Sequence, residues 1–193
     1  MTKWFLLAVA TLFGFTASAS ADEKNPIVLK LVAKTDKYKI DLGGRTADEY
    51  KKGLEEAAKK SAAGELLRPP APPKVDLLLQ ITNTGKEAVT IYVGGDPNVY
   101  TFELTGGAGS VNMNSGLAFT ADFRLPKAVE LAAGKSYEIA VKQLSDGSRG
   151  ASRFVYWTGP GEYKLTATYS LADKDGGKGA VLKSAPVKIT VEK

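Results

Sequence analysis

The sequence contains no cysteine and no histidine. Without cysteine, the chain has no disulfide framework, no thiol nucleophile and no cysteine that could carry a lipid. Without histidine it cannot build a Ser-His-Asp triad, and with both residues missing it lacks the usual nitrogen and sulfur ligands of zinc. We therefore expect a protein that is not an enzyme, that uses no cofactor and no metal, and that depends on its core for stability.

Long apolar runs are also scarce. The one candidate covers residues 4–15, follows Lys3 and is succeeded by small residues ending in Ala19-Ser20-Ala21. This layout is typical of a cleavable export signal, and the run is shorter than the roughly 20 residues needed to cross a membrane. We predict a signal peptide over residues 1–21 and one domain over residues 22–193. The expected location is periplasmic or secreted, with no membrane span after cleavage.

Neither sign of charge dominates the chain. It has 26 basic and 21 acidic residues; removing Lys3 with the signal leaves 25 and 21, a net charge of +4. Nucleic-acid binding would need a basic stripe with interleaved aromatic residues, and the charges here are mixed along the sequence. A mild positive balance favours weak attraction to anionic polymers. We expect a protein or glycan partner in the envelope or outside the cell, and no nucleic acid.

Alternation of apolar and polar residues predicts strands along most of the chain. The two clearest strands cover residues 75–83 and 163–171, and turn sequences rich in glycine, asparagine and aspartate separate the segments. Short strands without alternating helices favour a mainly β fold, an antiparallel β-sandwich. Weaker strands are predicted at residues 27–33, 89–93, 99–104, 117–125, 137–141, 153–157 and 187–191.

One helix interrupts this pattern, at residues 46–64. Thr46 and Glu49 have the spacing of a capping box, and Gly64 suits the carboxyl-terminal end. A narrow apolar stripe predicts a surface helix that packs by one edge. The stripe consists of Tyr50, Leu54, Ala57, Ala58 and Ser61.

A proline-rich segment follows the helix at residues 65–74 and contains RPPAPP. It could dock in an aromatic groove of a partner, or act as a stiff spacer within the fold. We interpret it as a strut, inserted with the helix before the main strands at residues 75–193.

The glycine-rich stretch TGGAGSVNMNSG, residues 105–116, raises the possibility of a phosphate-binding loop. A P-loop needs GxxxxGK followed by serine or threonine and then a helix. No lysine follows here, and the next segment alternates like a strand. We interpret the stretch as a connection between strands. Val111 and Met113 alternate with asparagines, so a short extra strand within the connection is possible.

The remaining chemistry is that of carboxylates. Asp76, Asp122 and Glu138 fall on the polar parity of their strands, so solvent-facing positions are favoured over a catalytic pair. Asp173 and Asp175 precede glycines as in a calcium loop, but the lysines among them favour a hairpin turn.

Loops at the end of a sandwich are the common place for function. Tyr92 precedes the GGDPN loop, and Tyr156 and Trp157 precede TGPGE, so one end could present aromatic side chains; the alternative is that Tyr156 and Trp157 fill the core. The candidate binding residues are Tyr92, Asp96, Asn98, Arg149, Tyr156 and Trp157.

Four segments resemble strands of bacterial immunoglobulin-like domains. They are VDLLLQITNTGKEAVTIYV (75–93), VELAAGKSYEIAV (129–141), GPGEYKLTATYSL (159–171) and SAPVKITVE (184–192). Their order is similar to that of the bacterial intracellular proteinase inhibitor family. The resemblance covers residues 75–193 and implies an antiparallel immunoglobulin-like β-sandwich; no inhibitory residue can be aligned.

We therefore predict an exported, non-catalytic binding or structural module that acts on a protein or polymer of the cell envelope. The alternative is a secreted proteinase inhibitor that presents GGDPN (94–98) or SDGSRG (145–150) as a rigid loop. A carboxylate-dependent hydrolase is a further alternative.

Overall fold

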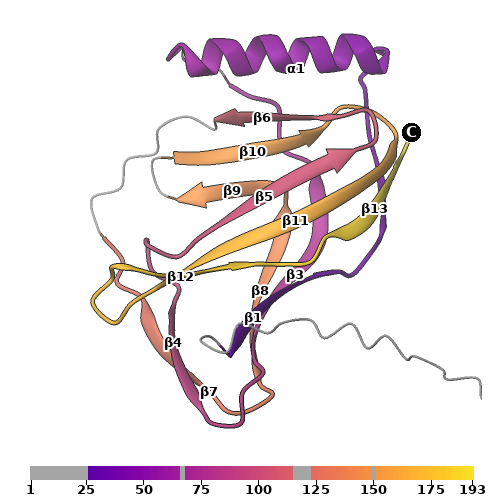
Figure 1. Ribbon diagram of the computed structural model, residues 1–193. Coiled ribbons are helices and arrows are strands. Elements are labelled where there is room, and N and C mark those ends of the chain that lie inside the picture. The colour runs from indigo at the N-terminus through magenta and orange to yellow at the C-terminus, as the bar shows by residue number, and fades with distance from the viewer. Residues whose placement is uncertain (1–25, 66–67, 115–122, 149–150) are drawn as a thin grey trace, which may run out of the picture.

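The structure is a computed structural model that describes residues 26–65, 68–114, 123–148 and 151–193. The protein is mainly β, with one helix and several sheets (Figure 1), as the sequence predicts. The predicted signal peptide at residues 1–21 lies outside the described residues. The elements are β1 (Ile27–Ala33), β2 (Lys37–Lys39), α1 (Ala47–Ala62), β3 (Lys74–Asn83), β4 (Val89–Val93), β5 (Val99–Gly106), β6 (Ser110–Asn114), β7 (Lys127–Leu131), β8 (Ser136–Gln143), β9 (Ser145–Ser148), β10 (Ala151–Trp157), β11 (Gly161–Ala172), β12 (Lys178–Lys183) and β13 (Val187–Glu192).

The strands of the described residues form three sheets. One has the order β1-β3-β8, and another the order β6-β10-β9. The largest has seven strands, in the order β2-β13-β11-β4-β7, with β12 and β5 also paired to β11. The strand pairs are antiparallel apart from β2 with β13, which is parallel.

Strand β11 is the centre of the seven-stranded sheet. Its first half pairs with β13, its second half with β12, and its other edge with β5. Such a strand needs an apolar inner face along its whole length, and Tyr163, Leu165, Ala167 and Tyr169 are all buried. The strand predicted at residues 163–171 is confirmed.

The core lies between this sheet and β1-β3-β8. Alternate residues of β3 point into it, and Leu77, Leu79 and Ile81 are fully buried. Each such side chain contributes about 1.5–3 kcal/mol relative to exposure. These side chains belong to the same buried cluster as the inner face of β11, so the two sheets stabilise each other.

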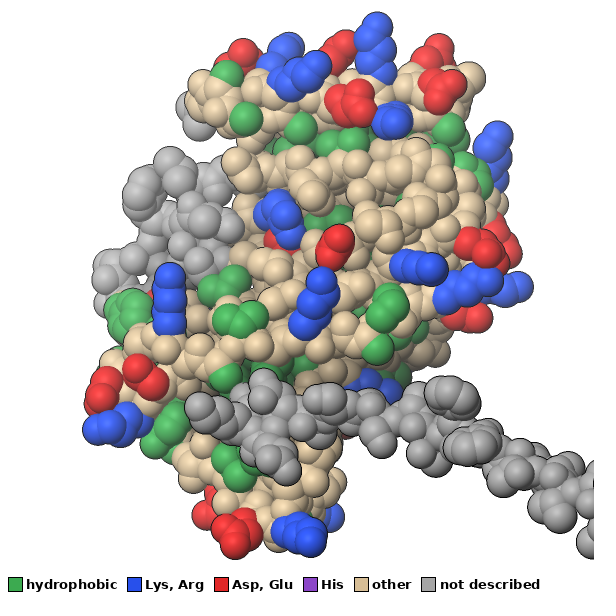
Figure 2. Space-filling model, viewed as in Figure 1, with side chains coloured by type: hydrophobic (Ala, Val, Ile, Leu, Met, Phe, Trp, Pro, Cys, Tyr) green, Lys and Arg blue, Asp and Glu red, His purple; other side chains and the backbone are tan. Residues whose placement is uncertain are grey.

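Helix α1 lies over β6, at the edge of the third sheet (Figure 1). Its start is the predicted capping box: Thr46 Oγ1 accepts from Glu49 N at 3.2 Å, and Glu49 Oε2 accepts from Thr46 N at 2.9 Å. Leu54 is buried against Val111 of β6, while the outer face carries mixed charges (Figure 2). The helix ends at Ala62 with Ala63 as its C-cap, and the next residue, Gly64, has a φ of +82° that suits glycine.

The proline-rich segment lies against the protein. Tyr156 Oη donates to the carbonyl of Pro70 at 2.6 Å, and Leu144 N donates to the carbonyl of Pro73 at 2.8 Å. Proline cannot donate backbone hydrogen bonds, so its carbonyls are the groups left to anchor it. These contacts attach the segment to the rest of the fold at Pro70 and Pro73.

The glycine-rich stretch connects β5 to β6, and Val111 and Met113 lie in β6. Gly107, with a φ of +51°, lies on the ring of Tyr163, where an added Cβ would meet ring carbons at 2.3–2.7 Å. Thr158 Oγ1 donates to the carbonyl of Ala108 at 2.7 Å. The loop is therefore held against the core by the close contact of Gly107 with Tyr163 and by the hydrogen bond from Thr158. Residues 115–116 lie outside the described residues.

Two predicted segments differ in the structure. Ser145–Ser148, expected to be a turn within SDGSRG, forms strand β9, because Asp146 is buried against β5 and β10. Of the strand predicted at residues 117–125, residues 117–122 lie outside the described part of the chain, and the rest is not in a strand.

Candidate functional site

A pocket of about 220 Å³ opens between β8 and the seven-stranded sheet. It forms because β8 is an edge strand of the three-stranded sheet. Val141, deeper along the inward side of β8, is 1% exposed. Tyr137 and Ile139 lie on the same side but remain only half-buried. The lining residues are Gly94, Gly95, Asn98, Tyr100, Arg124, Tyr137, Ile139 and Tyr169.

Three tyrosines from three strands give this pocket its chemistry: Tyr100 of β5, Tyr137 of β8 and Tyr169 of β11. Burial raises the pKa of Tyr169, and the neighbouring Tyr137 and Tyr100 raise it further. Burial also raises the pKa of Tyr100, with a smaller contribution from Asp146. The phenols of Tyr100 and Tyr169 therefore stay neutral. Tyr169 is 2% exposed, so the half-buried Tyr100 and Tyr137 offer more ring surface to a ligand.

The loop between β4 and β5 forms one wall and is held by its own side chains. Asn98 Nδ2 donates to the carbonyl of Tyr92 at 2.9 Å, and Gly95 N donates to Asn98 Oδ1 at 2.9 Å. Gly95 has no room for a side chain, since an added Cβ would lie 2.4 Å from Pro126 N. This wall is therefore fixed before any ligand arrives.

An ion pair lies at the mouth of the pocket. Asp96 accepts from the backbone N of Arg124 at 3.0 Å and from its Nε at 3.1 Å. The side chain of Asp96 is 10% exposed and that of Arg124 is 66% exposed. Asp96 thus positions the guanidinium, which remains open to solvent.

The structure brings Asp96 and Asn98 together at this pocket, with Tyr92 near the end of β4, just before the same loop. Asn98 lines the pocket, whereas Asp96 acts on it through Arg124. Tyr92 takes part through its backbone carbonyl, and its side chain is half-buried. Arg149 lies outside the described residues.

Tyr156 and Trp157 lie in the interior and not on a binding surface. Tyr156 is fully buried, and burial raises its pKa. Trp157 is 3% exposed and its ring lies 5.6 Å from that of Tyr38. The alternative that these two aromatics fill the core is the one that the structure supports, because β10 lies beneath α1 and the strut.

Sequence reasoning missed Tyr100, Tyr137, Tyr169 and Arg124. The inward parity of Tyr137 and Tyr169 predicts core positions, and nothing local shows that β8 ends its sheet. The usable signal was the repeated presence of tyrosine on inward-facing positions, since a tyrosine hydroxyl in a core calls for a partner or for water.

The buried carboxylate of the described chain, Asp146, already has its donors. It accepts from Phe102 N at 2.6 Å and from Arg153 Nη2 at 2.7 Å and Nε at 3.0 Å. Arg153 Nη2 also donates to the carbonyl of Phe102 at 2.9 Å. Asp146 and Arg153 thus join β9 and β10 to β5. Within the described ranges, acidic side chains form no cluster of three that could hold a metal ion.

Comparisons of the chain with protein-family models, with curated proteins and with solved structures found no match. In the part of the chain that the structure describes, no helix is long and apolar enough to span a membrane.

Proposed function

We propose that the protein is an exported, non-catalytic module that binds a protein or polymer of the cell envelope through the tyrosine pocket beside β8. The observation that carries this proposal is the convergence of three tyrosines and an exposed arginine on one pocket with a fixed wall. Tyrosine and arginine are the residues most enriched at binding hot spots. A rigid pocket binds without first ordering its own loops.

The fold within this proposal is immunoglobulin-like. Tyr163, near the start of β11, donates from its hydroxyl to the carbonyl of Gly159 at 2.7 Å, four residues upstream. This is the geometry of the tyrosine corner of immunoglobulin-like sandwiches. In such folds, loops and edges carry binding while the sheets supply rigidity.

Capture of cross-linked partners from an envelope extract tests the proposal. The bait is the chain from residue 22, and Arg124→Glu is compared with Lys164→Glu, a matched charge reversal on the exposed face of β11, outside the pocket. We expect a reproducible partner whose recovery falls at least about tenfold with Arg124→Glu and is unchanged with Lys164→Glu. Equal recovery by both variants, or no partner above background, would contradict a function at this pocket.

A second proposal is proteinase inhibition through the GGDPN loop, which the hydrogen bonds of Asn98 and the Asp96–Arg124 pair hold rigid. Inhibitory loops bind tightly because they are preorganised. Titration against a panel of serine proteases tests it: slowed cleavage of a reporter substrate supports inhibition, and plain digestion of the domain rejects it.

A further inference from the structure

We infer that the partner of the tyrosine pocket is an extended peptide segment of another protein, which adds as a strand to the free edge of β8 and places one apolar side chain in the pocket. The inference rests on the proposed function, and it specifies the partner as a protein and its mode of binding. Two features of β8 carry it: a backbone edge that pairs with no other strand among the described residues, and a pocket lined by the same strand.

The free edge follows from the register of β8 with β3. The bond from Asn83 N to the carbonyl of Lys135 sets the alternation, so Tyr137 and Ile139 exchange backbone bonds with β3. The N–H and C=O groups of Glu138 and Ala140 then point away from β3. Within the described ranges, no other strand pairs with β8. Its eight residues present a backbone template for strand addition.

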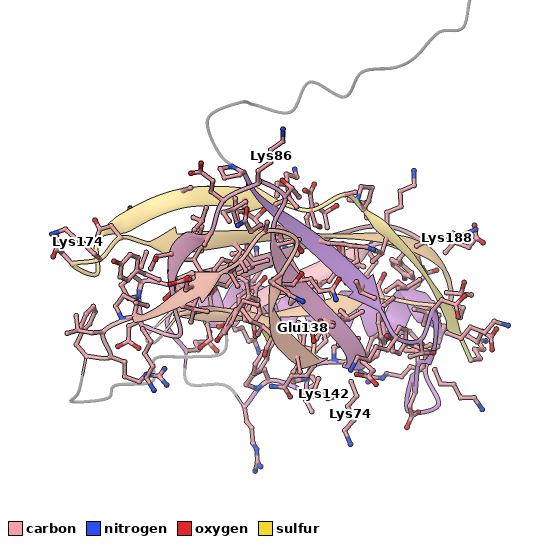
Figure 3. The ribbon with its side chains drawn as sticks, turned by 90° about the horizontal axis from the view of Figure 1, so that it is seen from below. Lys74, Lys86, Glu138, Lys142, Lys174 and Lys188 are labelled. Carbon is pink, nitrogen blue, oxygen red and sulfur yellow. The ribbon has the colours of Figure 1, made fainter. Side chains whose placement is uncertain are left out.

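The pocket lies on the core side of this same strand. Tyr137 and Ile139 line it and alternate with Glu138 and Ala140, whose backbone groups form the free edge. Figure 3 looks onto the sheet that contains β8 and labels Glu138 on it. In strand-addition complexes, backbone bonds supply affinity, and pockets for alternate side chains supply specificity. Here one strand provides both.

The size and charge of the pocket restrict the occupant. Its volume of about 220 Å³ is below the roughly 300 Å³ at which drug-sized sites begin, so it suits a single side chain. Neutral tyrosine rings and Ile139 favour a leucine, methionine or aromatic group. Arg124, 66% exposed at the mouth, favours an acidic residue next to that group.

Selection from a phage-displayed library of random eight-residue peptides, the length of β8, tests the inference on the chain from residue 22. We expect enrichment of peptides with one apolar residue beside an acidic one. The selected peptide is then made with N-methyl groups at alternate residues, in each of the two registers. The peptide methylated in one register should bind the protein at least about tenfold more weakly, and the peptide methylated in the other should lose much less affinity. The reason is that only alternate amides of an added strand face β8.

Ala140→Pro removes one outward N–H of β8 and leaves the bonds to β3 intact, and Ala140→Ser is the matched control that keeps it. Binding of the selected peptide, followed by fluorescence anisotropy, should weaken about tenfold with proline and remain unchanged with serine. The N-methylated peptides are tested on the unsubstituted chain, so they test strand addition even if Ala140→Pro fails to fold.

Absence of enrichment, or equal loss from both methylated registers, would overturn strand addition. A partner captured from envelope extract that depends on Arg124 but binds Ala140→Pro as well as Ala140→Ser would leave the binding module standing and reject strand addition. A captured partner that proves to be a glycan would have the same consequence.

Discussion

At the scale of single residues, side chains complete the backbone pairing on both sides of the central sheet. Phe102 of β5 and Ala167 of β11 lie opposite each other, and their remaining backbone groups face outward. Asp146 and Arg153 bind the N–H and C=O of Phe102. On the other side, Ser184 Oγ accepts from Ala167 N at 3.0 Å, and Ser184 N donates to the carbonyl of Ala167 at 2.8 Å. At these positions no neighbouring strand pairs with Phe102 or Ala167 on the outer side among the described residues, and Asp146, Arg153 and Ser184 supply the hydrogen bonds that their buried backbone groups need.

Asp146→Ala should therefore be strongly destabilising. It leaves the Phe102 N–H without its acceptor and Arg153 without its partner. Breaking a fully enclosed ion pair costs about 3–5 kcal/mol; because Arg153 is 32% exposed, we expect about 2–4 kcal/mol in the free energy of unfolding, measured by urea denaturation.

Asp76→Ala provides the matched control. Asp76 also lies 2.7 Å from its cation, Lys142, but their side chains are 44% and 67% exposed. Solvent screens such a pair, so we expect a much smaller change. Similar losses in the two variants would contradict the role assigned to Asp146.

At the scale of elements, α1 is attached along one stripe. Leu54 is its buried residue, and Ser61 Oγ donates to the carbonyl of Asn114 at 3.1 Å. Its stability therefore depends strongly on its own first turn, where Thr46 satisfies an amide that the helix cannot.

Thr46→Ala should cost about 1 kcal/mol and act mainly on α1. Hydrogen exchange should speed up across residues 47–62 while β3 amides remain protected, since β3 lies in the main core. Thr46→Ser keeps the capping oxygen and should restore slow exchange. Faster exchange in β3 and α1 alike would show that the helix is not a separate unit of stability.

The helix and the clearest strands could be predicted because their signals are local. The capping box and the apolar stripe through Leu54 involve residues of α1 and its cap alone. The alternation of buried and exposed residues along β11 involves that strand alone. Strand β9 and the tyrosine pocket depend on distant parts of the chain. Asp146 needs β5, and the half-buried Tyr137 lies on a strand that ends its sheet. No local pattern encodes which strand becomes an edge.

At the scale of the whole molecule, β10 couples the third sheet to the main core. Val155 and Trp157 belong to the large buried cluster, while Tyr156 belongs to the cluster beneath α1. Alternate residues of one strand thus face two cores. We infer that the third sheet and the two core sheets unfold together, because separating them would expose both faces of β10.

Trp157 allows this to be measured. The sequence has two tryptophans, Trp4 and Trp157, so a chain that begins at Asp22 has Trp157 alone as its tryptophan probe. Trp157 is 3% exposed and its ring lies against that of Tyr38, tilted by 31°. We expect its fluorescence and the far-ultraviolet circular dichroism to report the same urea midpoint, because one cooperative transition moves every probe together. A fluorescence transition at lower urea than the loss of strand signal would show that the third sheet separates before the main core unfolds.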